Sequence, residues 1–202
     1  MRLIVGISGA SGAIYGIRLL QVLRSRGDET HLILTPTARQ NILAETDHSP
    51  EEVEALASRV HPHDDLAAPI SSGSFRTDGM VVAPCSIKSL SAIANSFDSN
   101  LLVRAADVCL KERRTLVLVV RETPLHAGHL RLMAKAASLG AVILPPVPAF
   151  YHRPRTIDDL VDQTVGKVLD QFGIDAGLFR RWSGSTLKAG PPLPEGESGG
   201  AG

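Results

Sequence analysis

A glycine-rich stretch, GISGASGAIYG at residues 6–16, contains the first residues with evident chemistry. It follows a short apolar run and precedes leucines at helical spacing, which predicts a strand–turn–helix unit. Glycine allows the backbone to approach a ligand closely, and Ser8 and Ser11 add hydroxyl groups near the start of the helix. Because the amides and dipole of a helix N-terminus favour an anion, this turn predicts a phosphate site.

Two known phosphate-binding motifs are absent from this turn, and their absence limits which phosphate compounds it can bind. No Gly-Lys-Ser/Thr follows, so it is not a Walker loop, and Ser8 stands where the dinucleotide fingerprint requires glycine. The second predicted strand ends in Thr35-Pro-Thr37, with hydroxyls in place of the carboxylate that binds an adenosine ribose. The pattern favours FMN over NAD. The alternative is a tight turn that binds nothing.

Three further stretches place polar side chains directly after predicted strands, where ligands collect in parallel α/β sheets. They are PCSIKSLS (84–91) with Ser86 and Ser89, RETPL (121–125) with Arg121 and Glu122, and PPVPAFYHRP (145–154) with Tyr151, His152 and Arg153. Each has a structural alternative: a helix cap for the serines, a surface ion pair for the second stretch, and a crossover or subunit contact for the third.

Two other patterns are weaker. Arg104, Lys111 and Arg114 cluster in the helix-like stretch RAADVCLKERR (104–114), for which a solvated helix face is the simpler interpretation. His126 and His129 have a spacing that a metal ion can use, but no third ligand is apparent. We therefore expect no metal site.

Strand-like and helix-like segments alternate along the chain. Strands are expected at 2–8, 29–35, 80–84, 115–120 and 141–145, and helices at 11–26, 37–44, 50–60, 86–95, 101–113, 126–139 and 156–172. Strands that are apolar throughout, separated by helices, indicate a parallel sheet covered on both faces. The expected fold class is α/β, with a doubly wound parallel sheet in three α/β/α layers.

The composition limits the remaining function classes. Lys and Arg total 21, as do Asp and Glu, which argues against a nucleic-acid protein with a generally basic surface. The two cysteines lack metal-ligand spacing, and neither a signal peptide nor a membrane-spanning run is evident. We expect a cytoplasmic protein with no membrane partner. It should form one domain at 1–182, followed by a flexible Gly/Pro-rich tail at 183–202.

Several of these stretches together resemble a known family. GISGASGAIYGIRLL, APCSIKSLSAIA, RAADVCLKERR, RETPLHAGHLRLM and PPVPAFYHRP, in this order, are similar to the flavin prenyltransferases of the UbiX family, formerly described as aromatic-acid or polyprenyl-hydroxybenzoate decarboxylases. The resemblance covers residues 1–182 and ends at Arg181-Trp182. Because several motifs match over long runs, chance is a poor explanation.

The resemblance implies a Rossmann-like flavoprotein domain that assembles as a homododecamer with sites between subunits. It implies a metal-independent prenyltransferase, which joins the dimethylallyl group of dimethylallyl monophosphate to N5 and C6 of reduced FMN. The product, prenylated FMN, would serve a UbiD-type decarboxylase. The sequence leaves open whether that partner acts in ubiquinone biosynthesis or in aromatic-acid breakdown, and whether the donor is the monophosphate or the diphosphate.

The resemblance also assigns residues. For FMN it implies Gly9, Ala10, Ser11, Thr35, Ser86, Ile87, Lys88, Ser89 and Arg121. For the prenyl phosphate it implies Tyr151 and Lys167, with Arg104, Lys111 and Glu45 in supporting roles. The catalytic group would comprise Glu122, Arg121, Tyr151 and Lys167. Many relatives carry arginine in place of Lys167, and lysine keeps the charge but loses the bidentate fork.

Two other functions remain as alternatives. A flavin-dependent cysteine decarboxylase of the same superfamily needs a histidine after the second strand, and residues 35–44 contain none. A non-catalytic FMN carrier would not need Arg121, Glu122, Tyr151 and Lys167 together. Substitution of Lys167 or Tyr151 should abolish turnover in a prenyltransferase and change nothing in a carrier.

Overall fold

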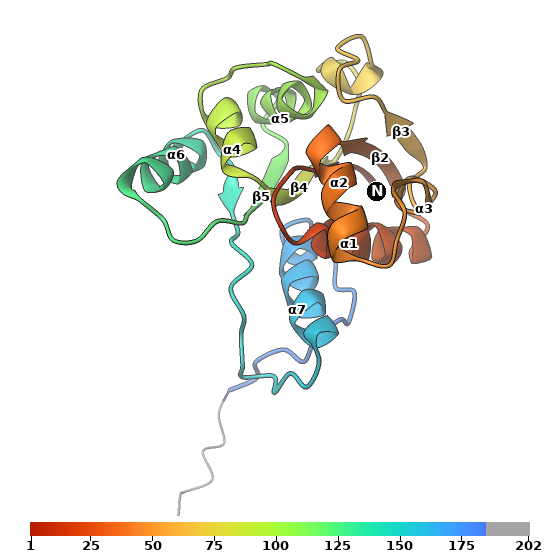
Figure 1. Ribbon diagram of the computed structural model, residues 1–202, viewed down its shortest axis with the longest axis vertical. Helices are drawn as coiled ribbons and strands as arrows, with labels where there is room; N and C mark the ends of the chain where they lie inside the picture. Colours follow the sequence, from red (N-terminus) through yellow and green to blue (C-terminus); the bar gives the residue numbers. More distant parts are fainter. Residues whose placement is uncertain (185–202) are drawn as a thin grey trace, which may run out of the picture.

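The computed structural model describes residues 1–184 of the chain (Figure 1). Its centre is one sheet of six parallel strands in the order β3-β2-β1-β4-β5-β6. The strands are β1 (Arg2–Ile7), β2 (Glu29–Leu34), β3 (Arg59–His61), β4 (Gly79–Cys85), β5 (Thr115–Val120) and β6 (Val142–Ile143). This arrangement confirms the expected doubly wound α/β fold.

Within residues 1–184, seven α-helices and one short 3-10 helix (Pro69–Ser71) lie between or after these strands. The α-helices are α1 (Ala13–Ser25), α2 (Pro36–Glu45), α3 (Pro50–Glu54), α4 (Ile87–Ala94), α5 (Leu101–Lys111), α6 (Ala127–Ser138) and α7 (Ile157–Asp170). One face of the sheet packs against apolar residues of α1, α2, α3 and α7, and the other against those of α4, α5 and α6. The sheet is therefore the middle of three layers.

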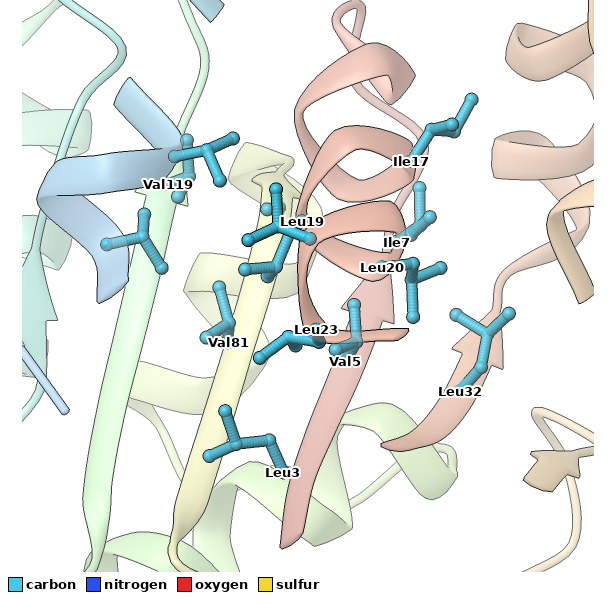
Figure 2. Packing of buried hydrophobic residues seen from close by; sticks show 14 of the residues in the cluster. Leu3, Val5, Ile7, Ile17, Leu19, Leu20, Leu23, Leu32, Val81 and Val119 are labelled. Atoms are coloured by element: carbon cyan, nitrogen blue, oxygen red, sulfur yellow. The ribbon is translucent and has the colours of Figure 1, made fainter. Parts of the chain in front are cut away.

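Alternation along the strands divides the core between these two faces. Leu3, Val5 and Ile7 point toward α1, while Ile4 belongs to the cluster on the opposite face. Figure 2 shows Leu19, Leu20 and Leu23 of α1 packed over the first of these faces. Burial on both faces explains why the strands are apolar throughout.

The strand order locates the site. The chain runs outward from β1 through β2 to β3, and then crosses to β4 on the other side of β1. In an open parallel sheet, a crevice forms at the carboxyl ends of the strands where this reversal occurs. The glycine-rich turn after β1 and the serine-rich turn after β4 therefore lie at the same edge.

One expected element differs clearly from the structure. The helix expected at 50–60 begins as predicted, because Ser49 and Glu52 form a reciprocal capping box, but it ends at Glu54. Residues Arg59–His61 form β3, which pairs with β2. The cause is tertiary: Ser58 N donates to Thr30 Oγ1 at 3.1 Å and Thr30 N donates to Ser58 Oγ at 3.0 Å, so the chain is drawn onto the sheet edge.

The last strand is also shorter than expected. Only Val142–Ile143 pairs with β5, because the prolines that follow remove backbone donors. The β6–α7 segment (residues 144–156) then extends away from the sheet before α7 returns to it (Figure 1). Of the tail expected at 183–202, residues 185–202 lie outside the described part. Within residues 1–184, no helix is both long and apolar enough to cross a membrane.

Candidate functional site

A large pocket opens at the carboxyl edge of the sheet, at the reversal of strand order. Its volume is about 1080 Å³, just above the usual range for pockets that bind small molecules and cofactors. It is lined by the turn after β1, the start of α2, the first turns of α4, the α4–α5 loop and the end of β5. The residues are Gly9, Thr35, Pro36, Thr37, His63, Ser86, Ile87, Lys88, Ser89, Ser91, Ala92, Asn95, Phe97, Ser99, Asn100, Val103 and Glu122.

Gly9 is required where the glycine-rich turn meets α2. A Cβ atom at this position would lie 2.5 Å from Cβ of Thr37, which is far too close. Thr35 is the N-cap of α2, and its Oγ1 accepts a hydrogen bond from Ala38 N at 3.2 Å. The hydroxyls of Thr35 and Thr37 therefore stand at the pocket wall, as the sequence predicts for a site without an acidic ribose-binding residue.

Ser8 has a structural role rather than a ligand-binding one. It is buried, its Oγ donates to Pro84 O at 2.8 Å, and it accepts from Ser86 N at 2.8 Å. The interpretation of Ser8 as a phosphate donor is therefore wrong, because its one donor hydrogen is already bonded to Pro84 O. Instead, this side chain ties the turn after β1 to the turn after β4 and so fixes the two polar walls of the pocket.

The start of α4 supplies the second polar wall. Ser86 is the N-cap, with Oγ accepting from Ser89 N at 3.2 Å and donating to Ser89 Oγ at 3.2 Å. Lys88 in the same turn is the cation of the pocket lining, and within residues 1–184 it forms no salt bridge. The segment 86–89 thus presents hydroxyls and one free ammonium group to the cavity.

The N-terminus of α1 already has an anion. Glu45, the last residue of α2, accepts a hydrogen bond from Gly12 N at 2.7 Å through Oε2, and Ala13 N lies 3.4 Å from the same oxygen. Gly12 has a φ of 101°, a left-handed conformation that favours glycine. Neither Ala10 nor Ser11 is among the pocket-lining residues. Their roles in FMN binding remain predictions, whereas Glu45 is placed beside the loop.

Arg121 and Glu122 follow β5. Arg121 N donates to Cys85 O at 3.1 Å, which continues the sheet toward the pocket. Burial raises the pKa of Tyr15 on α1, and the positive charge of Arg121 opposes this effect, so the guanidinium group lies within electrostatic range of Tyr15. Glu122 lines the pocket and is its carboxylate. Both residues are therefore at the carboxyl edge of the sheet, but only Glu122 is among the pocket-lining residues, and the role of Arg121 in binding stays a prediction.

Arg104 and Lys111 lie on α5, outside the pocket. Arg104 donates to Ser71 O at 3.0 Å and to Asp98 Oδ2 at 2.9 Å. Lys111 pairs with Glu112 at 2.5 Å and ends α5, shortly before β5 begins. Because α5 runs antiparallel to the strands, Lys111 lies at the amino edge of the sheet, opposite the pocket.

Tyr151 and Lys167 lie on the other side of the molecule. Tyr151, in the β6–α7 segment, makes edge-to-face contacts with His152 and Trp182, with ring centroids 5.5 and 6.0 Å apart. Lys167 on α7 pairs with Asp170 at 3.3 Å and remains half exposed. Helix α7 covers the face of the sheet opposite α5. A single chain therefore brings neither residue together with Arg104, Lys111 or the pocket.

The sequence analysis missed several pocket residues. Phe97, Ser99 and Asn100 come from the α4–α5 loop, and His63 comes from the segment after β3. A signal existed for Asn100, which is the N-cap of α5 and accepts from Val103 N at 3.1 Å. No local signal marks His63, because its place depends on β3, which the sequence analysis assigned to a helix.

The two histidines considered for metal binding lie on and before α6. His126 is the N-cap of this helix, and its ring centroid lies 3.6 Å from that of His129. Over residues 1–184, no three His, Cys, Asp or Glu side chains converge in a way that holds a metal ion.

Comparisons with known proteins agree with this geometry. A family model described as Flavoprotein matches residues 1–169. The flavin prenyltransferase UbiX of Escherichia coli K12 is 65% identical, covering 91% of this chain and 99% of that protein. The crystal structure of AnUbiX (PadA1) in complex with FMN and dimethylallyl pyrophosphate is 54% identical, with a TM-score of 0.90 over 91% of this chain and 98% of that one. A dodecameric FMN-dependent UbiX-like decarboxylase from E. coli O157:H7 is 51% identical, with a TM-score of 0.89 over 91% and 100%.

Proposed function

The chain belongs to the UbiX family of flavin prenyltransferases, and we propose that it transfers a dimethylallyl group from a dimethylallyl phosphate to reduced FMN. The observation that carries the proposal is the pocket at the switch point, where hydroxyls, one ammonium group and the carboxylate of Glu122 face a single cavity. The relatives add support, since one is named a flavin prenyltransferase and another holds FMN together with dimethylallyl pyrophosphate.

The residues of this pocket fit FMN. Its volume of about 1080 Å³ accommodates a flavin mononucleotide and leaves room for a small second substrate. Because Gly9 has no side chain, it avoids the clash that a Cβ atom would make with Thr37 at the pocket wall. Thr35, Ser86, Lys88 and Ser89 would bind the polar parts of the flavin, with Ile87 as an apolar contact. In the proposed site Arg121 would contact both the flavin and the prenyl phosphate.

The proposed reaction is balanced without a metal or an oxidant. Reduced FMN would supply nucleophilic N5 and C6. A bond from N5 would replace the bond between the dimethylallyl group and phosphate oxygen, and a bond from C6 would form at the expense of the dimethylallyl double bond. The electron pair of the broken C–O bond leaves on the phosphate. N5 loses a proton, ring closure exchanges the C6 proton for one on the former double bond, and the products are prenylated FMN and hydrogen phosphate.

The protein would assist this transfer mainly by electrostatics. Negative charge grows on the departing phosphate, and Arg121, Lys167, Lys111 and Tyr151 are assigned to stabilise it. Arg104 would support this group. Glu122 lines the pocket, and either Glu122 or the released phosphate is assigned as the base that accepts the N5 proton. Glu45 would act by holding the glycine-rich turn through Gly12 N.

Completion of the site would require neighbouring subunits. Lys111 and Lys167 lie on helices at opposite faces of the sheet, and neither lines the pocket. A homododecamer like that of the E. coli O157:H7 relative would allow cations from adjacent copies to meet one flavin. In this proposal the prenylated FMN is then delivered to a UbiD-type decarboxylase.

A flavin-dependent decarboxylase is the second candidate because one histidine, His63, does line the pocket. It comes from the segment after β3 rather than from the helix after β2. This candidate predicts that the chain releases CO2 from a peptide ending in cysteine with oxidised FMN, and that His63→Asn abolishes that release. A prenyltransferase releases none.

Release of inorganic phosphate tests the proposed function. The full chain is incubated anaerobically with reduced FMN and dimethylallyl monophosphate, and phosphate is measured against flavin consumed. We expect one phosphate per flavin with reduced FMN and none with oxidised FMN, the matched control, which lacks the nucleophilic N5. A carrier that stores FMN would release no phosphate with either form, and this result would reject the proposal.

A further inference from the structure

A partly buried hydrogen-bond chain, with the buried His31 at its centre, joins β2 to β3 at the edge of the sheet, away from the residues assigned above. His31 is only 1% exposed. Its Nε2 lies 3.0 Å from Glu29 Oε1, and its Nδ1 lies 2.9 Å from Nε2 of His61. The two imidazole planes are inclined by only 9°, with ring centroids 5.1 Å apart. We call His31 and His61 the histidine clasp.

Proton counting limits what the histidine clasp can hold. A carboxylate only accepts, so Nε2 of His31 carries a proton that it donates to Glu29. One further proton lies between the two rings, on His61 Nε2 or on His31 Nδ1. If both rings became imidazolium ions, both facing nitrogens would carry hydrogen atoms at a separation of 2.9 Å. The geometry therefore admits one positive charge in the clasp but excludes two.

The surroundings favour a neutral His61. Burial lowers the pKa of His61, and the positive charges of His31 and Arg59 lower it further, while Asp65 acts in the opposite direction. Arg2 donates to Glu29 Oε2 at 2.8 Å and thereby holds the carboxylate that faces His31.

An aromatic ring also covers the clasp. Phe75 contacts the His31 ring edge-to-face, with centroids 5.2 Å apart, and the Arg2 guanidinium carbon lies 5.0 Å from the centre of the Phe75 ring. Among residues 1–184, the carboxylates that act on the two rings are Glu29, which bonds to His31, and Asp65, which faces His61.

The histidine clasp is connected to the flavin pocket through two residues. His61 ends β3, an edge strand of only three residues, and Pro62 and His63 follow it. The carbonyl oxygen of His63 accepts from Leu101 N at 2.7 Å, which anchors the start of α5, and His63 lines the pocket. His63 is thus held from one side by β3 and from the other by the start of α5. If β3 leaves the sheet edge, the first of these two anchors is lost.

We propose that the histidine clasp is a proton-sensitive latch. The clasp holds the His63 wall of the flavin pocket while at most one of its two rings is positively charged, and it releases this wall when both rings are. Acid would therefore weaken flavin binding through β3 rather than through any residue that contacts the flavin. The second half of this inference rests on the proposed flavin site, whereas the first half concerns the fold alone.

The variant His61→Gln tests the latch directly. Its side-chain amide can donate to His31 Nδ1 as neutral His61 does, but it cannot accept a proton at this pH. His48→Gln is the matched control, because His48 is a partly exposed histidine outside the clasp, and its Nδ1 lies 4.0 Å from a carboxylate oxygen of Glu52.

The first measurement is urea unfolding of the full chain without flavin, at fixed protein concentration, between about pH 7 and pH 5. A group with a lowered pKa in the fold is protonated only on unfolding, so stability is lost as pH falls below the unfolded value of about 6.5. The wild-type unfolding constant should rise by up to about tenfold more per pH unit than that of His61→Gln. Equal slopes in both proteins would overturn the latch.

The second measurement is FMN affinity over the same pH range. The wild type and His48→Gln should lose affinity toward pH 5, and His61→Gln should lose several-fold less. If His61→Gln flattens the unfolding slope but not the affinity curve, the coupling to the pocket is refuted. If no variant binds FMN at any pH, the proposed function fails, and the unfolding slopes still decide on the latch.

Discussion

The residues assigned to the flavin and those assigned to the prenyl phosphate are distributed differently in the fold. Most of the flavin set lies at one sheet edge, where Ser8 ties the turns after β1 and β4 together. The phosphate set is scattered: Lys111 ends α5 on one face, and Lys167 lies on α7 at the other. A parallel sheet assembles its own crevice, whereas cations on opposite faces can meet only through other copies of the chain.

The largest effect should come from removing a phosphate cation. We predict that Lys167→Met lowers kcat by about 100- to 1000-fold, the usual cost of losing an electrostatic contact to a developing anion, with FMN affinity unchanged. Asp170 keeps its ion pair with Arg181 at 2.7 Å, so the fold should persist. The measurement is steady-state turnover together with flavin titration.

Two control variants sharpen this prediction. Lys167→Arg should retain activity, because arginine offers a bidentate fork to phosphate. Arg131→Met, which removes a charge from the surface of α6, should change neither turnover nor affinity. Equal losses in Lys167→Met and Arg131→Met would mean that net charge, and not this position, controls the reaction.

Mixed assemblies test whether the scattered cations meet between subunits. We predict that co-expressed Lys111→Ala and Lys167→Ala chains, each inactive alone, regain about a quarter of wild-type activity. In a random mixture about a quarter of the sites would combine an intact Lys111 from one copy with an intact Lys167 from another. Activity should be measured on isolated mixed oligomers; no recovery would place both lysines on the same subunit's site.

A smaller effect should distinguish two helix N-caps, Ser86, which lines the proposed flavin pocket, and Ser49, which does not. Ser86→Ala and Ser49→Ala each remove an N-cap hydroxyl, so each should cost about 1 kcal/mol of unfolding free energy. Only Ser86 lines the pocket, and only Ser86→Ala should weaken FMN binding, by about tenfold. Urea unfolding and flavin titration give the two values. Weaker FMN binding in Ser49→Ala would show that stability alone controls affinity.

The smallest effect concerns a thiol at the same edge. Burial raises the pKa of Cys85 to about 12, so only about one thiol in ten thousand is ionised near pH 8. We predict negligible labelling of Cys85 by a thiol reagent in the native protein and rapid labelling after unfolding in urea. Fast labelling of the folded chain would contradict the assignment of this cysteine to the core.

The sequence predicts what depends on local pattern. Apolar strands, the start of the helix at residue 50 and the polar turns after β1, β4 and β5 were all evident from residue types and spacing. It did not predict β3, because the Thr30–Ser58 hydrogen bonds that draw Arg59–His61 onto the sheet join residues far apart in sequence. His63 was missed for the same reason.

Two further assignments needed the structure. Ser8 and the α1 N-terminus were interpreted as parts of a phosphate site, yet Pro84 O takes the Ser8 hydroxyl and the Glu45 carboxylate takes the amide of Gly12. Both partners come from distant elements, and no spacing rule reveals them. The family resemblance placed Glu45 near the site, although its contact with Gly12 became clear only in three dimensions.

The mass of the flavin after reaction tests the central claim most directly. The full chain is incubated anaerobically with FMN, a reductant and dimethylallyl monophosphate, and the released flavin is weighed by mass spectrometry. The account predicts a gain of one isoprenyl unit, which Tyr151→Phe largely removes while FMN binding persists. Recovery of unchanged FMN from the wild type, tightly bound, would contradict the account and favour a carrier or a decarboxylase.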